Sequence, residues 1–201
     1  MNFHERARHV IEQEAEAIRS IPPELIDTTL AKLAGWILRC KGKVVTTGMG
    51  KNGYIAKRVA ATMASTGTPA FYIHPGEASH GDTGMVSAGD ILLAMSNSGK
   101  TREVLEAVEK IKDLHGDHVR IVVFTGHPSS PLSALADLSL SYGEIIEPCP
   151  VGLTPSSSLA VMSALADALA LGVMEMRGFT VEAFGKRHWS GYLGKKIAES
   201  I

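Results

Sequence analysis

Five short apolar runs alternate with helical patterns through most of the chain, and this alternation restricts the fold more than any other feature. Runs rich in Val, Ile and Leu that end in Gly or polar residues are typical of strands buried on both faces. Helices between such runs supply the right-handed crossovers that parallel strands need. The sequence therefore predicts an α/β domain whose parallel sheet is covered by helices on both faces.

The pattern assigns residue ranges to these elements and places two helices before the sheet. The expected strands are 43–48, 69–73, 90–96, 119–126 and 137–142, and the expected helices are 3–20, 23–40, 51–65, 101–114, 130–136 and 155–176. We expect a single domain over 1–201, with a helical pair (1–40), a sheet core (41–177) and a tail (178–201). Residues 74–89 form the longest expected loop, and long loops inside compact domains are usually functional.

The composition points to a cytoplasmic protein without nucleic-acid or membrane partners. The 20 Lys and Arg residues nearly balance the 21 Asp and Glu residues, so no basic surplus favours nucleic acid. Cys40 and Cys149 are the only cysteines, which suits a reducing compartment. The N-terminus lacks the apolar core of a signal peptide. The apolar stretch 155–176 contains Asp167 and Glu175, so we interpret it as a buried helix rather than a membrane span.

The segment 94–108, AMSNSGKTREVLEAV, is the clearest candidate binding site. It joins an expected strand to an expected helix, so backbone N–H groups and the positive helix end point at one place. Ser96, Ser98 and Thr101 add hydroxyl groups, and Gly99 allows a tight turn. These features predict a phosphate cradle. The alternative is that Ser98 or Thr101 merely caps the helix.

Two nucleotide-binding motifs are approached but not completed. AMSNSGKT resembles a P-loop, yet Ala94 replaces the first glycine and the strand 119–126 ends in Thr-Gly rather than in a metal-binding aspartate. GMGKNG, at 48–53, is a complete G-x-G-x-x-G, but the next strand lacks the acidic residue of a dinucleotide site, and Glu77 lies beyond Pro75. Two cradles at neighbouring strand ends instead predict a small phosphorylated ligand across the carboxyl edge of the sheet.

Four motifs together resemble a known family. They are GMGKNG, ASTGTPAFYIHPGEASHGDTGMV, SNSGKTREV and EPCPVGLTPSSS, and the likeness extends over 40–196. The chain is similar to sugar isomerase (SIS) domains and, more closely, to D-arabinose 5-phosphate isomerases. The resemblance implies the SIS fold, a five-stranded parallel sheet in a three-layer sandwich, and homo-dimers or homo-tetramers with sites at subunit interfaces. Longer relatives carry CBS domains, and we expect this chain to be the short form that lacks them.

The family's chemistry interconverts D-arabinose 5-phosphate and D-ribulose 5-phosphate through an enediolate, which feeds Kdo and surface polysaccharide synthesis. Such a reaction needs a base near C1 and C2, a group that opens the sugar, and positive charge near the developing oxyanion. No redox cofactor is required, and the phosphate is a remote handle for positioning. Two alternatives stay open: a phosphosugar-binding regulatory module without turnover, and an isomerase of another sugar phosphate.

The resemblance assigns catalytic roles to Lys51, Glu103, Glu147 and His188. Each also has a plain structural interpretation: a solvated lysine, a glutamate that complements a helix dipole, a surface carboxylate, and a histidine in a tail packed for stability. The tail reads His-Trp-Ser-Gly-Tyr-Leu-Gly where relatives read His-Pro-Gly-Gly-Ala-Leu-Gly. We expect His188 to shuttle protons or open the ring, and to reach into a neighbouring subunit's site.

The resemblance also assigns substrate contacts and one metal contact. The substrate-binding residues are Gly50, Gly67, Thr68, His80, Ser96, Asn97, Ser98 and Thr101. His74 matches a metal-contacting histidine, and a divalent metal such as zinc would there inhibit rather than catalyse; a structural role for His74 is equally open. Ser156, Ser157 and Ser158 either cap the last long helix or line the sugar pocket.

Overall fold

The computed structural model describes residues 1–192 and contains a parallel sheet of five strands in the order β2-β1-β3-β4-β5. The strands are β1 (Val44–Gly48), β2 (Ala70–Tyr72), β3 (Ile91–Met95), β4 (Arg120–Thr125) and β5 (Leu138–Ser141). Val44 pairs with Ala70 on one side and with Ile91 on the other, so β1 lies inside the sheet. The predicted α/β class and the five parallel strands are confirmed.

The strand order reverses between β1 and β3. From β1 the chain crosses to β2 on one side, whereas from β3 it crosses to β4 and then β5 on the other side. Ligands of open α/β sheets bind at such a reversal, outside the carboxyl ends of the strands. Both predicted cradles follow these two strands, so the topology brings 48–53 and 96–101 together at the reversal.

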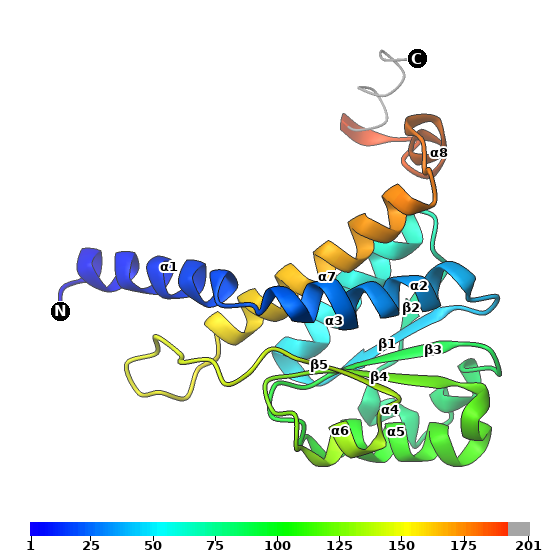
Figure 1. Ribbon diagram of the computed structural model, residues 1–201, viewed down its shortest axis with the longest axis horizontal. Helices are drawn as coiled ribbons and strands as arrows, with labels where there is room; N and C mark the ends of the chain where they lie inside the picture. Colours follow the sequence, from blue (N-terminus) through cyan, green and yellow to red (C-terminus); the bar gives the residue numbers. More distant parts are fainter. Residues whose placement is uncertain (193–201) are drawn as a thin grey trace.

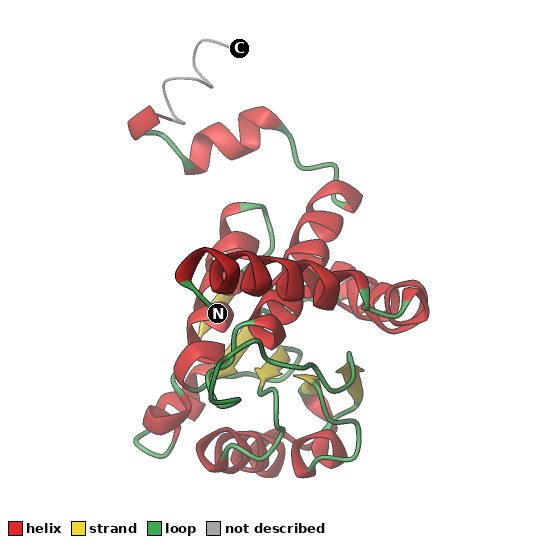
Figure 2. Cartoon of the chain, turned by 90° about the vertical axis from the view of Figure 1, so that its left-hand side faces the viewer, coloured by secondary structure: helices red, strands yellow, loops and turns green. Residues whose placement is uncertain are grey.

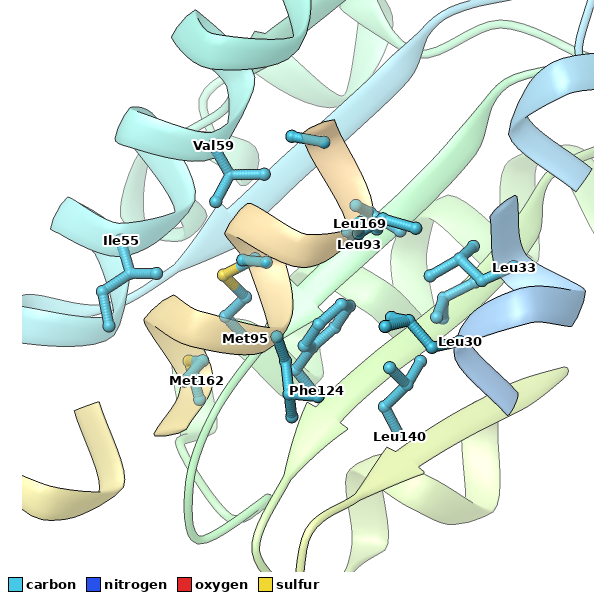
Figure 3. Packing of buried hydrophobic residues seen from close by; sticks show 14 of the residues in the cluster. Leu30, Leu33, Ile55, Val59, Leu93, Met95, Phe124, Leu140, Met162 and Leu169 are labelled. Carbon is cyan, nitrogen blue, oxygen red and sulfur yellow. The ribbon is translucent and has the colours of Figure 1, made fainter. Parts of the chain in front are cut away.

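Helices cover both faces of the sheet, as Figures 1 and 2 show. One layer contains α1 (Phe3–Arg19), α2 (Ala31–Arg39), α3 (Gly50–Ser65) and α7 (Ser157–Met176). The other contains α4 (Pro75–Ala78), α5 (Arg102–His115) and α6 (Pro131–Leu135). Each layer has its own buried cluster. Phe124 and Met162 belong to the first (Figure 3), and Ile73 and Val104 to the second. The predicted three-layer sandwich is therefore confirmed.

The helix α7 is the most apolar of the long helices, and three other helices pack against it. It packs against α1, α2 and α3, while α1 itself buries no residue and extends outward from the body (Figure 1). Among the described helices, α7 alone is long and apolar enough to cross a bilayer, yet half of its most apolar window is buried inside the protein. This agrees with the interpretation of 155–176 as a core helix.

Four segments differ from the sequence-based expectation. The expected helix 23–40 begins as a π-helical segment, η1 (Leu25–Leu30), before α2. The expected loop 74–89 contains α4 and a 3₁₀ turn, η2 (Asp82–Met85). A 3₁₀ turn, η3 (Gly116–His118), follows α5, and α8 (Val181–Arg187) lies in the expected tail. Helices this short give no 3.6-residue periodicity, and capping and proline start α4 instead.

Candidate active site

The turn after β3 is organised around hydroxyl groups. Ser96 is 1% exposed, and its Oγ lies 3.0 Å from Thr101 Oγ1. Thr101 occupies the N-cap position of α5 but makes no capping hydrogen bond with its side chain. Ser98 Oγ accepts from the Lys100 N–H at 3.2 Å, inside the turn. Neither hydroxyl caps α5, so the interpretation of Ser98 or Thr101 as a simple helix cap is wrong.

Gly99 is required by the shape of this turn. Its φ is +60°, and a Cβ there would collide with the Ser130 side chain. The Gly99 carbonyl accepts from Leu132 N at 3.1 Å, which ties the turn to α6. The hydroxyl-rich turn is thus held by a neighbouring element instead of by the helix it precedes.

The turn after β1 contains the positively charged residue of the candidate site, Lys51. Gly50 starts α3 with φ +58°, and Lys51 follows it, exposed in the first helical turn. The Tyr72 hydroxyl donates to the Gly48 carbonyl at 2.8 Å and so braces the end of β1 from β2. Asn52 Oδ1 is buried and accepts no hydrogen bond from the described residues. Lys51 thus lies beside the strand reversal, and its contact with a phosphate or an enediolate stays a prediction.

Glu147 lies at the N-terminus of α7, where its carboxylate is bound by the helix itself. Oε2 accepts from the N–H groups of Ser156 at 2.7 Å and Ser157 at 2.8 Å, and Oε1 accepts from that of Ser158 at 3.2 Å. These bonds fix the carboxylate in one orientation and complement the positive end of a 20-residue helix. The hydroxyls of the same three serines are buried without a partner in the described chain. The serines thus contact Glu147 through their backbones and keep their hydroxyls available.

Glu103 lines a cavity of about 520 Å³ between α4, η2 and α5. Pro75, Gly76 and Thr83 form the opposite wall, and Lys110 closes the far end along α5. This cavity begins at the first turn of α5, directly beyond the hydroxyl-rich turn. Its placement supports a site-shaping role for Glu103, although the role itself stays a prediction.

The two predicted histidines of the 74–89 segment have different surroundings. His74 is the N-cap of α4, and its Nδ1 accepts from the Gly76 N–H at 3.1 Å. His80 is exposed in the turn between α4 and η2. No group of three or more His, Cys, Asp or Glu side chains suited to a metal occurs among residues 1–192. The structure gives His74 a capping role, and the inhibitory-metal hypothesis stays a prediction.

Gly67 and Thr68 do not join the other predicted residues within one chain. They precede β2 and lie at the amino edge of the sheet, opposite the cradles. Thr68 Oγ1 accepts from Arg177 Nε at 3.1 Å, and a Cβ on Gly67 would meet the Phe179 ring at 2.6 Å. Both residues therefore anchor the segment after α7. Within one chain both residues lie away from the cradles, and their substrate contact stays a prediction.

His188 is also remote from the cradles of its own chain. It follows α8, which leaves the body beyond the C-terminus of α7 (Figure 1), whereas Glu147 lies at the other end of that helix. A 20-residue helix spans about 30 Å. His188 stacks on Phe184 with ring centroids 3.8 Å apart. The part of the predicted tail from 193 onward lies outside the described residues.

The structure adds two tyrosines that the sequence analysis missed. Tyr72 braces Gly48, and Tyr142 donates a hydrogen bond to Asn97 Oδ1 at 2.7 Å. Both stand at carboxyl ends of strands, where the other site residues were found. That position was the available signal; Tyr72 also lies in one of the four family motifs, whereas Tyr142 lies in none of them.

A doubly wound sheet with two glycine-containing polar turns at its strand reversal has the arrangement at which open α/β sheets bind ligands. Residues 37–172 match the sequence model of the SIS domain, and the chain belongs to that family. It is 42% identical to the arabinose 5-phosphate isomerase KdsD of Pseudomonas aeruginosa and 40% identical to that of Escherichia coli K12, over 98% of this chain. The chain spans 59% and 58% of the length of these relatives.

A solved structure shows the same relationship. The chain superposes on an Escherichia coli CFT073 protein in complex with arabinose 5-phosphate, with a TM-score of 0.83 and 39% identity. The match covers 94% of this chain and 100% of the other. Sequence and fold therefore point to the same group of relatives over more than nine-tenths of this chain.

Proposed function

We propose that this chain is an aldose–ketose isomerase that interconverts D-arabinose 5-phosphate and D-ribulose 5-phosphate. The observation that carries the proposal is the juxtaposition, at one sheet edge, of two anion cradles with a lysine and a fixed carboxylate. The KdsD relatives and the neighbour with bound arabinose 5-phosphate support the choice of sugar. The proposed reaction uses no redox cofactor.

In the proposed mechanism, the hydroxyl-rich turn binds the phosphate and leaves the other end of the sugar near Lys51 and Glu147. Binding energy at the remote phosphate holds C1 and C2 in place. Glu147 removes the proton from one carbon and returns it to the other, because its carboxylate is already oriented by the α7 amides. Lys51 stabilises the enediolate oxygen, and His188 of a neighbouring chain, as the proposed proton shuttle, moves the hydroxyl proton from O2 to O1. Glu103 shapes the wall beside the sugar.

The proposed product suggests which pathway the protein serves. Arabinose 5-phosphate of this origin would feed Kdo and surface polysaccharide synthesis in the cytoplasm. We propose a homo-dimer or homo-tetramer, because His188 can serve a site only if that site belongs to another chain. The length of α7 and the anchoring of Arg177 at the amino edge support this arrangement.

Proton exchange in heavy water tests the activity directly. Incubation of the protein with arabinose 5-phosphate in D₂O should place deuterium on C2, the carbon next to the carbonyl. NMR measures this exchange as the loss of the C2 proton signal. Heat-inactivated protein and the Glu147→Gln variant serve as controls. A protein that binds pentose phosphates by calorimetry but exchanges no proton with any of them would be a regulatory module instead.

Mixed oligomers test the shared site. Glu147→Gln and His188→Ala are expected to be inactive alone, and co-refolding equal amounts should restore about a quarter of wild-type activity in a dimer, because half of the dimers are mixed and each has one intact site. Differently tagged chains, co-purified, establish that mixed oligomers form. If they form and stay inactive, His188 does not act on a neighbour's site.

A further inference from the structure

The end of β5 holds a buried tyrosine that the proposed mechanism does not use. Tyr142 is 4% exposed, and its hydroxyl donates to Asn97 Oδ1 at 2.7 Å. A buried phenol needs an acceptor for its own proton, since an unpartnered buried hydroxyl is costly. Tyr142 therefore sets the orientation of the Asn97 amide: Oδ1 faces the tyrosine, and Nδ2 faces away from it.

The backbone of Asn97 is fixed as firmly as its side-chain oxygen. Its carbonyl accepts from Thr125 Oγ1 at 2.9 Å and from Gly126 N at 3.0 Å. Gly126 permits this arrangement, because a Cβ there would lie 2.8 Å from Asn97 Oδ1 and 3.4 Å from Tyr142 Cε2. Both oxygens of Asn97 are thus engaged. Within residues 1–192, its Nδ2 group donates no hydrogen bond.

Asn97 lies in the turn where the proposed site would bind an oxygen of the ligand. It lies between Ser96 and Ser98 in the hydroxyl-rich turn, at the strand reversal, and is partly exposed. Burial, and then the negative charge of Glu147, raise the pKa of Tyr142, so its hydroxyl keeps its proton throughout the physiological range. Tyr142 therefore neighbours both the cradle and the proposed base.

We propose that Tyr142 is a positioning residue that aims the Asn97 Nδ2 group at an oxygen of the bound sugar phosphate. This inference rests on the proposed function, because it adds a contact to the same site. Tyr142 does not touch the ligand and acts only through Asn97. Losing it should therefore weaken binding, whereas the proton-transfer groups are left in place.

A double-mutant cycle tests this dependence. Tyr142→Phe, Asn97→Ala and the double variant are compared for affinity by calorimetry and for kcat and KM in the isomerase assay. We expect Tyr142→Phe to raise Kd and KM about 3- to 10-fold, with kcat changed less than about twofold. The double variant should bind no worse than Asn97→Ala alone. Multiplying effects, or an unchanged KM in Tyr142→Phe, would overturn the proposal.

Two further measurements separate positioning from stability. Tyr54→Phe, at an exposed tyrosine with 72% accessibility, is the matched control and should leave KM unchanged. The side-chain amide signals of Asn97 in ¹⁵N-labelled wild type should shift on adding arabinose 5-phosphate, and this readout needs no variant to fold. Unshifted Asn97 amide signals at saturation would overturn the proposal. A wild type that binds the sugar without isomerising it overturns the proposed function instead, and the cycle is then read from affinities alone.

Discussion

The two edges of the sheet are ends of the same strands, yet they differ in how completely their buried polar atoms are hydrogen-bonded. At the amino edge, Asp90 is 1% exposed and accepts from the N–H groups of Lys43 at 2.7 Å and Ser87 at 2.9 Å. At the carboxyl edge, Asn52 and the serines that start α7 have buried oxygens without partners in the described chain. Unpartnered buried polar atoms are costly, and among the described residues they gather at the edge where the proposed site lies.

The largest expected effect in this contrast comes from removing the carboxylate at the carboxyl edge. Glu147→Gln should lower turnover roughly 10²- to 10⁴-fold if Glu147 is the base, while phosphosugar affinity changes only a few fold. The variant should also melt at a lower temperature, because an amide cannot accept from all three N–H groups of α7 as the carboxylate does. Steady-state kinetics and thermal unfolding measure the two effects.

Two comparisons keep that result interpretable. Glu144→Gln, at an exposed glutamate three residues earlier, should change neither turnover nor melting temperature. Glu103→Gln is the competing assignment. If it abolishes proton exchange and Glu147→Gln does not, Glu147 is only the cap of α7 and Glu103 is the base.

A smaller effect is expected from the hydroxyls of the turn. Ser98→Ala and Thr101→Val should each weaken phosphosugar binding by about 1.5–3 kcal/mol, since a hydrogen bond to a charged group is lost. Isothermal titration measures the change. Thr28→Val is a matched control, because the Thr28 hydroxyl bonds to Glu24 O on an exposed helix away from the cradles. Unchanged affinity in both turn variants would contradict the cradle.

The smallest expected effect compares the two cysteines, one near each edge. Hydrogen bonds from the side chain and backbone of Thr154, together with neighbouring N–H groups, lower the pKa of Cys149 to about 6. Cys40 instead donates its S–H to Gly89 O at 3.3 Å. At pH 7, Cys149 should react with iodoacetamide faster than Cys40, because hydrogen bonds to its sulfur favour the reactive thiolate.

The pH dependence of the Cys149 reaction rate tests the lowered pKa of its thiol. The Cys149 rate should rise as pH increases through about 6 and then level off, because the thiolate is the reactive form. Mass spectrometry of the two peptides measures both rates in one sample. Equal rates at pH 7, or a Cys149 rate that does not level off above pH 6, would show that the Thr154 hydrogen bonds do not form in solution.

The strands and long helices were predictable because their signals are local and periodic. Each strand end lies within one residue of its expected position. The partners of the site residues were not predictable in this way. Tyr142 and Asn97 are separated by 45 positions, and only the β3-β4-β5 order brings them together. Motif likeness likewise located Glu147 but gave no indication that the α7 amides bind its carboxylate.

Gly67 and Thr68 show the limit of motif likeness most clearly. They stand in the same motif as His74 and His80, so the resemblance grouped all four. The motif, however, passes through β2 from one sheet edge to the other. Residues that are close in the sequence therefore lie a strand's length apart in the structure. Thr68 contacts Arg177 instead of the cradles.

The length of α7 has a consequence for how this protein would behave on dilution. The helix keeps the carboxylate at its beginning about 30 Å from the segment anchored at its end, and no loop in between allows the two to approach. If the proposed site takes its histidine from a neighbour, a lone chain carries two halves of two different sites. Specific activity would then follow mass action, falling as the protein concentration drops below the dissociation constant of the assembly.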